Sequence, residues 1–222
     1  MAELDSGLLA AHHEWLESGG KKGRKLVLTG ADLSGADLNS VALDQACLAH
    51  ANLSGADLGG AFVSQADLTG ANLSGTYLRK TEFSGSRLVG AVLRGACCVK
   101  TEFNRADLTG ADLSRIYLAW SYLSDTVLNG TNFTEADVCL SLSGKKFDVS
   151  RVTGMTGAIG SDADLVTVVG DGPERQITIA ELVEILNRRG AQVTTWPKGH
   201  SPDSPPWRWG HSGFPFVIQE NS

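Results

Sequence analysis

The sequence lacks the features that would place it in a membrane or outside the cell. No apolar stretch reaches the length of about 20 residues that a membrane-spanning helix needs. The start, Met1-Ala2-Glu3-Leu4-Asp5, is acidic, and no long apolar run of a secretory signal peptide follows it. These two absences predict a cytoplasmic protein without a membrane partner.

Positive charge is also scarce. The 222 residues contain 19 Lys and Arg against 25 Asp and Glu, which gives a net charge of −6. Binding to nucleic acid is driven mainly by Lys and Arg on phosphate groups. We therefore do not expect the chain to bind nucleic acid directly.

Cysteine is rare and carries no metal-binding pattern. Cys47, Cys97, Cys98 and Cys139 do not have the paired spacing of zinc ligands, and the five histidines add no cluster. We expect free thiols in a reducing compartment, with no metal and no cofactor. If the adjacent Cys97 and Cys98 lie in an extended segment, they should point to opposite sides of it.

A catalytic constellation is missing as well. Gly154, Gly157 and Gly160 are three residues apart, but no strand-turn-helix signal for a phosphate-binding loop surrounds them. Three aspartates near this region lack a partner nucleophile and base. The sequence predicts that the protein is not an enzyme.

What the sequence does contain is a repeat of five residues, from Ala31 to about Leu140. The third position of all twenty-two blocks is apolar, from Leu33 to Val138, and the first position is almost always small. This period fits neither a helix nor a strand, so it predicts one short extended segment and one turn per block. Thr81-Glu82-Phe83 recurs as Thr101-Glu102-Phe103, which indicates that four blocks form a coil and that residues twenty apart stack.

The blocks have the pattern A(D/N)LXX, as in Ala31-Asp32-Leu33, Ala51-Asn52-Leu53, Ala66-Asp67-Leu68 and Ala106-Asp107-Leu108. This pattern resembles the pentapeptide-repeat family. The resemblance implies an all-β solenoid, a right-handed quadrilateral β-helix of about 5.5–6 coils. It says little about function, because function depends on sites added to a fold.

The chain divides into four predicted parts. Residues 1–25 form a capping helix over 4–17, with Leu4, Leu8, Ala11 and Trp15 on its apolar stripe, and a basic linker. Residues 26–160 form the β-helix. Residues 161–196 form a small strand-helix-strand unit, and residues 197–222 are a tail rich in Pro and Trp that we expect to dock on the protein or on a partner.

The unit at 161–196 has clear local signals. Its helix is expected over 179–189, with Thr178 as N-cap and Glu181 completing a capping box. Strands are expected at 165–169 and 191–196. The unit either caps the far end of the coil or makes a homodimer, since relatives often pair through their C-terminal ends.

Position two of each block faces solvent and carries most of the acidic residues of the repeat. Six of them are candidates for a partner-binding acidic face: Asp32, Asp37, Asp57, Asp67, Asp107 and Asp112. The resemblance implies that they imitate DNA phosphates, as in family members that protect or inhibit DNA gyrase. The alternative is that Asp and Asn belong to the repeat itself, where they serve turns and solubility.

A second candidate surface is aromatic. Tyr77 and Tyr117 are forty residues apart and are expected on one face, within the column Asp37, Asp57, Tyr77, Cys97, Tyr117 and Asp137. Trp120 and Tyr122 follow closely. Clustered aromatic residues mark interfaces, although they are also compatible with ordinary, partly shielded surface positions.

These observations favour a non-enzymatic rod that binds another macromolecule. The most specific hypothesis, taken from the resemblance, is a DNA mimic that binds a type II topoisomerase, DNA gyrase or topoisomerase IV, and inhibits or protects it. The alternative is a scaffold or effector whose partner docks on the C-terminal unit, with the β-helix as a spacer.

Overall fold

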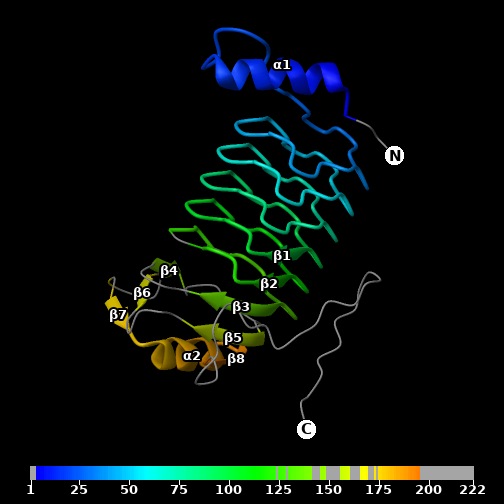
Figure 1. Ribbon diagram of the computed structural model, residues 1–222. Coiled ribbons are helices and arrows are strands. Elements are labelled where there is room, and N and C mark those ends of the chain that lie inside the picture. The colour runs from blue at the N-terminus through cyan, green and yellow to red at the C-terminus, as the bar shows by residue number, and fades with distance from the viewer. Residues whose placement is uncertain are drawn as a thin grey trace.

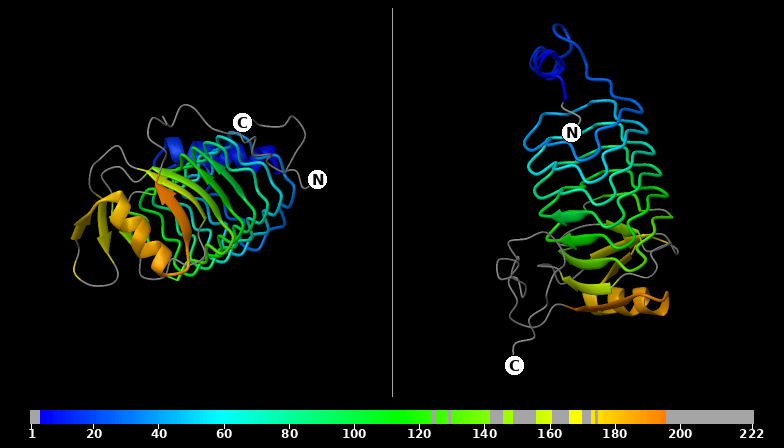
Figure 2. Two further views of the ribbon diagram at one scale, coloured as in Figure 1. Left: turned by 90° about the horizontal axis from the view of Figure 1, so that it is seen from below. Right: turned by 90° about the vertical axis from the view of Figure 1, so that its right-hand side faces the viewer.

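Parallel bridges between residues twenty apart define the central part of the protein. The computed structural model describes residues 4–123, 125–128, 130–141, 146–148, 156–160, 166–169, 173 and 175–195. Within it, bridges run from Val27–Cys47 to Asp112–Asn132 without a change of spacing. Four blocks therefore make one coil, as predicted, and the coils stack into a β-solenoid (Figures 1 and 2).

The position-two residues form four columns, and we number the solenoid faces after them. Face 1 carries Val27, Cys47, Asp67, Arg87, Asp107 and Val127, and face 2 carries Asp32, Asn52, Asn72, Val92, Asp112 and Asn132. Face 3 carries Asp37, Asp57, Tyr77, Cys97, Tyr117 and Asp137, and face 4 carries Ala42, Phe62, Glu82, Glu102 and Tyr122. The column predicted for face 3 is confirmed.

In a block with Asp or Asn at position two, each backbone N–H has its own partner, as the block Ala51–Gly55 shows. The N–H at position one donates to the carbonyl three residues earlier (3.0 Å), and that at position two donates to the preceding coil (2.8 Å). Those at positions three and five donate to the following coil (2.7 and 2.8 Å). The remaining N–H, at position four, donates to the side-chain oxygen of Asn52 (3.2 Å). Satisfying every N–H in this way is what a closely packed backbone requires.

Position five makes the corner of each turn. Its φ angle is positive in every block from Gly30 to Glu135, and half of these residues are not glycine, including Gln45, Lys80 and Arg105. A left-handed conformation costs a non-glycine residue about 1 kcal/mol. The coil-to-coil hydrogen bond of the same residue helps to offset this cost.

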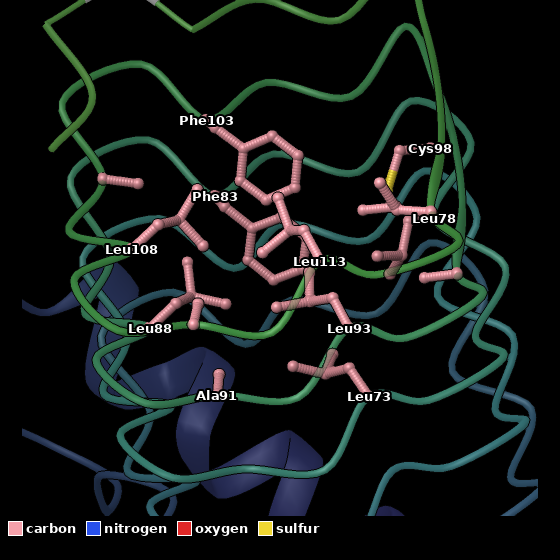
Figure 3. Packing of buried hydrophobic residues seen from close by; sticks show 14 of the residues in the cluster. Leu73, Leu78, Phe83, Leu88, Ala91, Leu93, Cys98, Phe103, Leu108 and Leu113 are labelled. Atoms are coloured by element: carbon pink, nitrogen blue, oxygen red, sulfur yellow. The ribbon is translucent and has the colours of Figure 1, made fainter. Parts of the chain in front are cut away.

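The interior is filled by positions one and three. All position-three side chains from Leu33 to Val138 are buried. Phe83 and Phe103 stack with ring centroids 5.2 Å apart and planes within 4°, as the twenty-residue period predicts (Figure 3). Where position one is Thr or Ser, its hydroxyl is satisfied inside the wall; Thr81, for example, donates to the carbonyl of Leu58 (2.7 Å).

Helix α1 (Ser6–Glu17) lies across the first coil (Figure 1). Asp5 caps it by accepting from the N–H of Gly7 (2.6 Å). The predicted apolar stripe is partly wrong, because Leu8 is 43% exposed and the fully buried residue is His12. A histidine takes this place because both ring nitrogens find backbone partners in the first coil.

His12 joins the helix to the solenoid as a neutral side chain. Its Nδ1 accepts from the backbone N–H of Leu26 (3.1 Å), so the ring proton lies on Nε2, which donates to the carbonyl of Asp44 (3.1 Å). The ring stacks on Trp15, with centroids 5.9 Å apart. Burial lowers the pKa of His12 below its ordinary value of 6.5.

Short strands appear where the coils continue toward the C-terminus. A five-stranded parallel sheet has the order β1 (Cys97–Val99), β2 (Tyr117–Ala119), β3 (Asp137–Ser141), β5 (Thr156–Gly160) and β8 (Gln192–Thr195). The first three strands belong to face 3, so β5 and β8 extend that face past the last regular coil. A second sheet has the order β4 (Lys146–Asp148), β6 (Val166–Val169) and β7 (Arg175–Ile177).

Helix α2 (Ile179–Arg188) lies at the end opposite α1 (Figure 1). The capping box is present: Thr178 accepts from the N–H of Glu181 (3.2 Å), and the Glu181 carboxylate accepts from the N–H of Thr178 (2.7 Å). Leu182 and Leu186 are fully buried in the same apolar cluster as the coils. The strand expected at 165–169 appears as β6 and that at 191–196 as β8. Neither α1 nor α2, the two helices of the described residues, could cross a membrane.

Leu73 provides a test of the closed interior. It is fully buried, so Leu73→Asp places an unpaired charge in an apolar interior and should lower the free energy of unfolding by about 3 kcal/mol or more. Urea unfolding followed by circular dichroism measures this. The control is Val127→Asp, an exposed position two on the same face as Asp107; equal losses in the two variants would contradict the assignment of inside and outside.

His12 predicts that stability falls in mild acid. The buried ring has a lowered pKa, so its contribution is present above pH 6.5 and is lost as pH falls toward the folded-state pKa, by up to about 1.4 kcal/mol per pH unit. Asp44, Lys25 and His13 are the charged or titratable groups around it. Asp44 favours protonation of His12, and Lys25 and His13 oppose it.

Urea midpoints between pH 8 and pH 5 test this for the wild type and for His12→Gln, which cannot titrate. We expect a smaller loss in His12→Gln. His13→Gln, at an exposed position of the same helix, should behave as wild type. The same pH dependence in wild type and His12→Gln would show that His12 does not control it.

Candidate functional site: the outer wall of the solenoid

The six acidic candidates lie on three faces of the solenoid. Asp67 and Asp107 belong to face 1, Asp32 and Asp112 to face 2, and Asp37 and Asp57 to face 3. The pair on face 3 occupies neighbouring coils, whereas Arg87 stands between the pair on face 1. The acidic residues therefore form short groups along the wall.

All six carboxylates have the same local hydrogen bond. In each, Oδ1 accepts the N–H of the residue two positions later, at 2.8–3.1 Å. Asn52, Asn72 and Asn132 make this bond in the same way. Asp and Asn therefore serve the turn in the same way. They differ in charge and in one further bond, because the Asn amide also donates to the side chain stacked below it, as Asn52 does to Asp32 (3.0 Å).

Hydrogen bonding also keeps some of these groups ionised. Hydrogen bonds from Ser34 lower the pKa of Asp32, and the hydroxyl of Thr69, which donates at 2.6 Å, lowers that of Asp67. The charge of Arg87 adds to the effect at Asp67. These two side chains are permanent negative charges at neutral pH.

Basic residues interrupt the acidic groups. Arg79 and Lys80, which follow Tyr77 in the chain, and Lys100, which follows Cys97, are exposed. On face 2, Arg115 pairs with Glu135 of the next coil, with 2.6 Å between Nε and Oε2. A partner would meet alternating signs along most of the wall.

The aromatic candidates do not form one patch. Tyr77 on face 3 is 41% exposed and Tyr122 on face 4 is 47% exposed. Tyr117 is only 6% exposed, so its prediction as a surface residue is wrong. It belongs to a second apolar cluster with Cys97, Val99 and Ala119, against which Trp120 packs.

The two adjacent cysteines lie on opposite sides of the wall, as predicted. Cys98 belongs to the interior cluster and Cys97 to the cluster on face 3. Both are buried, and burial raises the pKa of the Cys97 thiol to about 11. The side of the wall is predictable from the sequence, but the burial of the outward Cys97 is not.

Face 4 carries a group that the sequence interpretation did not single out. Phe62 and Tyr122, 44% and 47% exposed, stand on either side of Glu82 and Glu102 in the column of face 4, which begins with Ala42. Burial, and then the neighbouring charges of Glu102 and Asp44, raise the pKa of Glu82. The twenty-residue period predicts that these four residues share one column, because each is twenty residues from the next.

The described residues contain no group of three or more His, Cys, Asp or Glu side chains arranged to hold a metal ion. The wall is thus a candidate surface for contact with a macromolecule, built from fixed columns of side chains.

A family model described as pentapeptide repeats matches the chain in eight copies, over residues 46–85, 72–110, 86–118 and 111–138. Matching solved structures include HetL, involved in heterocyst differentiation regulation, from the cyanobacterium Nostoc sp. strain PCC 7120. It is 24% identical, with 71% of this chain and 84% of that chain covered and a TM-score of 0.46.

Rfr23 from the cyanobacterium Cyanothece 51142 is 26% identical over 60% of this chain and 97% of that chain, with a TM-score of 0.47. QnrB1, a plasmid-mediated fluoroquinolone resistance protein, is 17% identical over 77% of this chain and 92% of that chain, with a TM-score of 0.33. No curated protein matches the chain.

The shared role of Asp and Asn can be separated from charge at Asp107. Asp107→Asn keeps an oxygen that accepts the N–H of Thr109, so stability should change by less than about 0.5 kcal/mol. Asp107→Ala removes the acceptor and should cost about 1 kcal/mol. Urea unfolding of both variants measures the difference, and equal stabilities would show that the turn does not depend on this bond.

Proposed function

Because residues 46–138 belong to the pentapeptide-repeat family, we propose that this protein is a non-enzymatic rod that binds a protein partner along the outer wall of its solenoid. The observation that carries the proposal is the fixed spacing of exposed charged and aromatic side chains. They repeat once per coil, at about 4.8 Å, on a backbone held by hydrogen bonds between neighbouring coils. Such a surface is preorganised, so little conformational entropy is lost on binding.

In its most specific form, the proposal is that the rod imitates duplex DNA and binds a type II topoisomerase, DNA gyrase or topoisomerase IV, inhibiting or protecting it. The support is chemical: Asp37 and Asp57 present neighbouring negative charges on face 3, and Asp32 stands on the adjacent face. The net charge of −6 favours approach to a cationic DNA channel. The repeat motif resembles that of family members that act on gyrase, and this resemblance is the reason for choosing gyrase as the target.

Asparagine substitution provides a clean test of this form. The variant with Asp→Asn at 32, 37, 57, 67, 107 and 112 removes six negative charges and keeps all six turn acceptors. In a supercoiling assay with purified gyrase, with and without a quinolone, the wild-type protein should inhibit or protect, and the variant should require at least about ten times more protein.

The control variant has Gln in place of Glu14, Glu17 and Glu184, which are exposed on α1 and α2, and should act as wild type. An effect of wild type that the six-site variant retains in full would exclude phosphate mimicry by these residues. No effect at micromolar wild-type protein would exclude this target, and the proposed rod would then have another partner.

A second candidate function is a scaffold or effector whose partner, or a second copy of the chain, docks on the C-terminal unit. The observation that favours it is the position of β8, the last strand of the five-stranded sheet, whose outer edge pairs with no described strand. An unpaired edge accepts an added strand from another chain. Sedimentation equilibrium tests self-association, and removal of 197–222 tests the partner, which this candidate should lose and wall binding should keep.

A further inference from the structure

Two glutamates on face 4 differ from the aspartates of the other faces in how their oxygens are used. Glu82 and Glu102 stack on one another in neighbouring coils. The six aspartates of the acidic candidates each accept a backbone N–H of their own turn. In the described part of the chain, no group donates a hydrogen bond to the carboxylate of Glu82 or Glu102, and neither forms an ion pair. Their oxygens are therefore available to a partner.

The stacked carboxylates also repel one another. Their backbones are one coil spacing apart, about 4.8 Å. Burial, and then the negative charges of Glu102 and Asp44, raise the pKa of Glu82. Lys80 and Lys100 lie at a corner of the same coils, but both are exposed and neither forms an ion pair within the described residues. A cation placed between Glu82 and Glu102 would relieve their repulsion.

An aromatic side chain stands on either side of the glutamates. Phe62 lies one coil before Glu82, and Tyr122 lies one coil after Glu102. These two side chains are 44% and 47% exposed. Exposed aromatic rings bind apolar side chains, and they attract cations through the negative faces of the rings. This part of face 4 therefore has a negative centre between two aromatic groups.

We propose that face 4 binds an extended segment of a protein partner with the pattern apolar–x–Arg–x–apolar, lying along the axis of the rod. The arginine binds between Glu82 and Glu102, and the two apolar side chains contact Phe62 and Tyr122. This inference rests on the proposal that the outer wall binds a protein, and it adds the face and the chemistry of the partner. It does not depend on the imitation of DNA.

The spacing of the column favours an extended segment over a helix. Alternate side chains of a strand lie on the same side, about 6.8 Å apart. The midpoint between Glu82 and Glu102 is one and a half coil spacings, about 7.2 Å, from Phe62 and from Tyr122. Three alternate side chains thus meet the three parts of the column. Side chains at i, i+4 and i+7 of a helix span only about 10.5 Å, against about 14.4 Å between the two aromatic residues.

Arginine fits the centre of this site better than lysine does. The planar guanidinium presents five N–H donors in a fixed fork, so that it can reach one oxygen from each of two carboxylates. Its flat face also stacks on aromatic rings, such as those of Phe62 and Tyr122. The ammonium group of lysine is a compact charge that is more strongly hydrated. The site therefore selects a side chain that is both cationic and planar.

A synthetic peptide tests the proposal on the full-length protein. The probe is fluorescein-labelled Gly-Ser-Leu-Ser-Arg-Ser-Leu-Ser-Gly, and fluorescence anisotropy measures its binding. We expect saturable binding with a dissociation constant below about 1 mM. The variant Glu82→Gln, Glu102→Gln should bind at least about tenfold more weakly, because it removes both charge-assisted hydrogen bonds. The variant Phe62→Ser, Tyr122→Ser should bind at least about threefold more weakly.

Two matched controls separate this site from attraction by net charge. Asp37→Asn, Asp57→Asn removes two stacked negative charges from face 3 and keeps an acceptor for each turn, so this variant should bind the probe as wild type does. A probe with citrulline in place of arginine keeps the planar shape and loses the charge, and it should bind at least about tenfold more weakly. Circular dichroism verifies the fold of every variant.

Three results would each overturn the inference: no saturable binding at millimolar probe, unchanged binding by the Glu82→Gln, Glu102→Gln variant, or equal losses in the face 3 and face 4 variants. The gyrase assay gives an independent result, because none of its six aspartates belongs to face 4. The six-site asparagine variant retains Glu82 and Glu102 and should bind the probe. Failure of phosphate mimicry and failure of this inference are therefore distinguishable.

Discussion

The stacked coils leave one backbone N–H of a block for a side chain to satisfy, and Asp or Asn at position two does so. Stacking satisfies four of the five N–H groups in a block such as Ala51–Gly55, through the neighbouring coils and the turn. The fifth, at position four, points back into its own block, and a short side chain with an oxygen at position two reaches it. An acceptor two residues away favours Asp and Asn over longer side chains. The acidic character of the rod is therefore first a property of its turns.

This origin of the charge affects how function is assigned to the wall. Asp32 and Asn52 stack on face 2 and make the same turn bond, and the amide of Asn52 also donates to the carboxylate of Asp32 (3.0 Å). An amide can therefore replace a carboxylate at position two without loss of the turn bond. Any functional role of the negative charge is separate from the role of the side chain in the turn. An aromatic residue at position two, such as Phe62, has no acceptor for the turn, and there the N–H of Ser64 donates to Asp44 of the preceding coil instead (3.0 Å). The presence of Phe62 at this exposed position of face 4 is not required by the backbone.

Much of the fold was predictable because the period fixes which residues meet. The stacked rings of Phe83 and Phe103, the face 3 column and the capping box of Thr178 and Glu181 all follow from spacing. The burial of Tyr117 and His12 did not follow. Alternation assigns a side chain to one side of the wall, but it does not fix how exposed an outward residue is, and Tyr117 is buried with Cys97, Val99 and Ala119. His12 is buried because backbone groups of Leu26 and Asp44 converge on its ring, and no local pattern encodes that convergence.

Because residues stack every twenty positions without a break, the length of the rod can change independently of the direction in which its faces point. Removing twenty residues would shorten the solenoid by one coil and leave every later side chain on its original face. Removing five would turn everything downstream by a quarter of a revolution, so that the Tyr77 column would align with a different face of the first coils. The number of five-residue blocks therefore sets both the distance between two groups of surface residues along the rod and the direction in which each group faces.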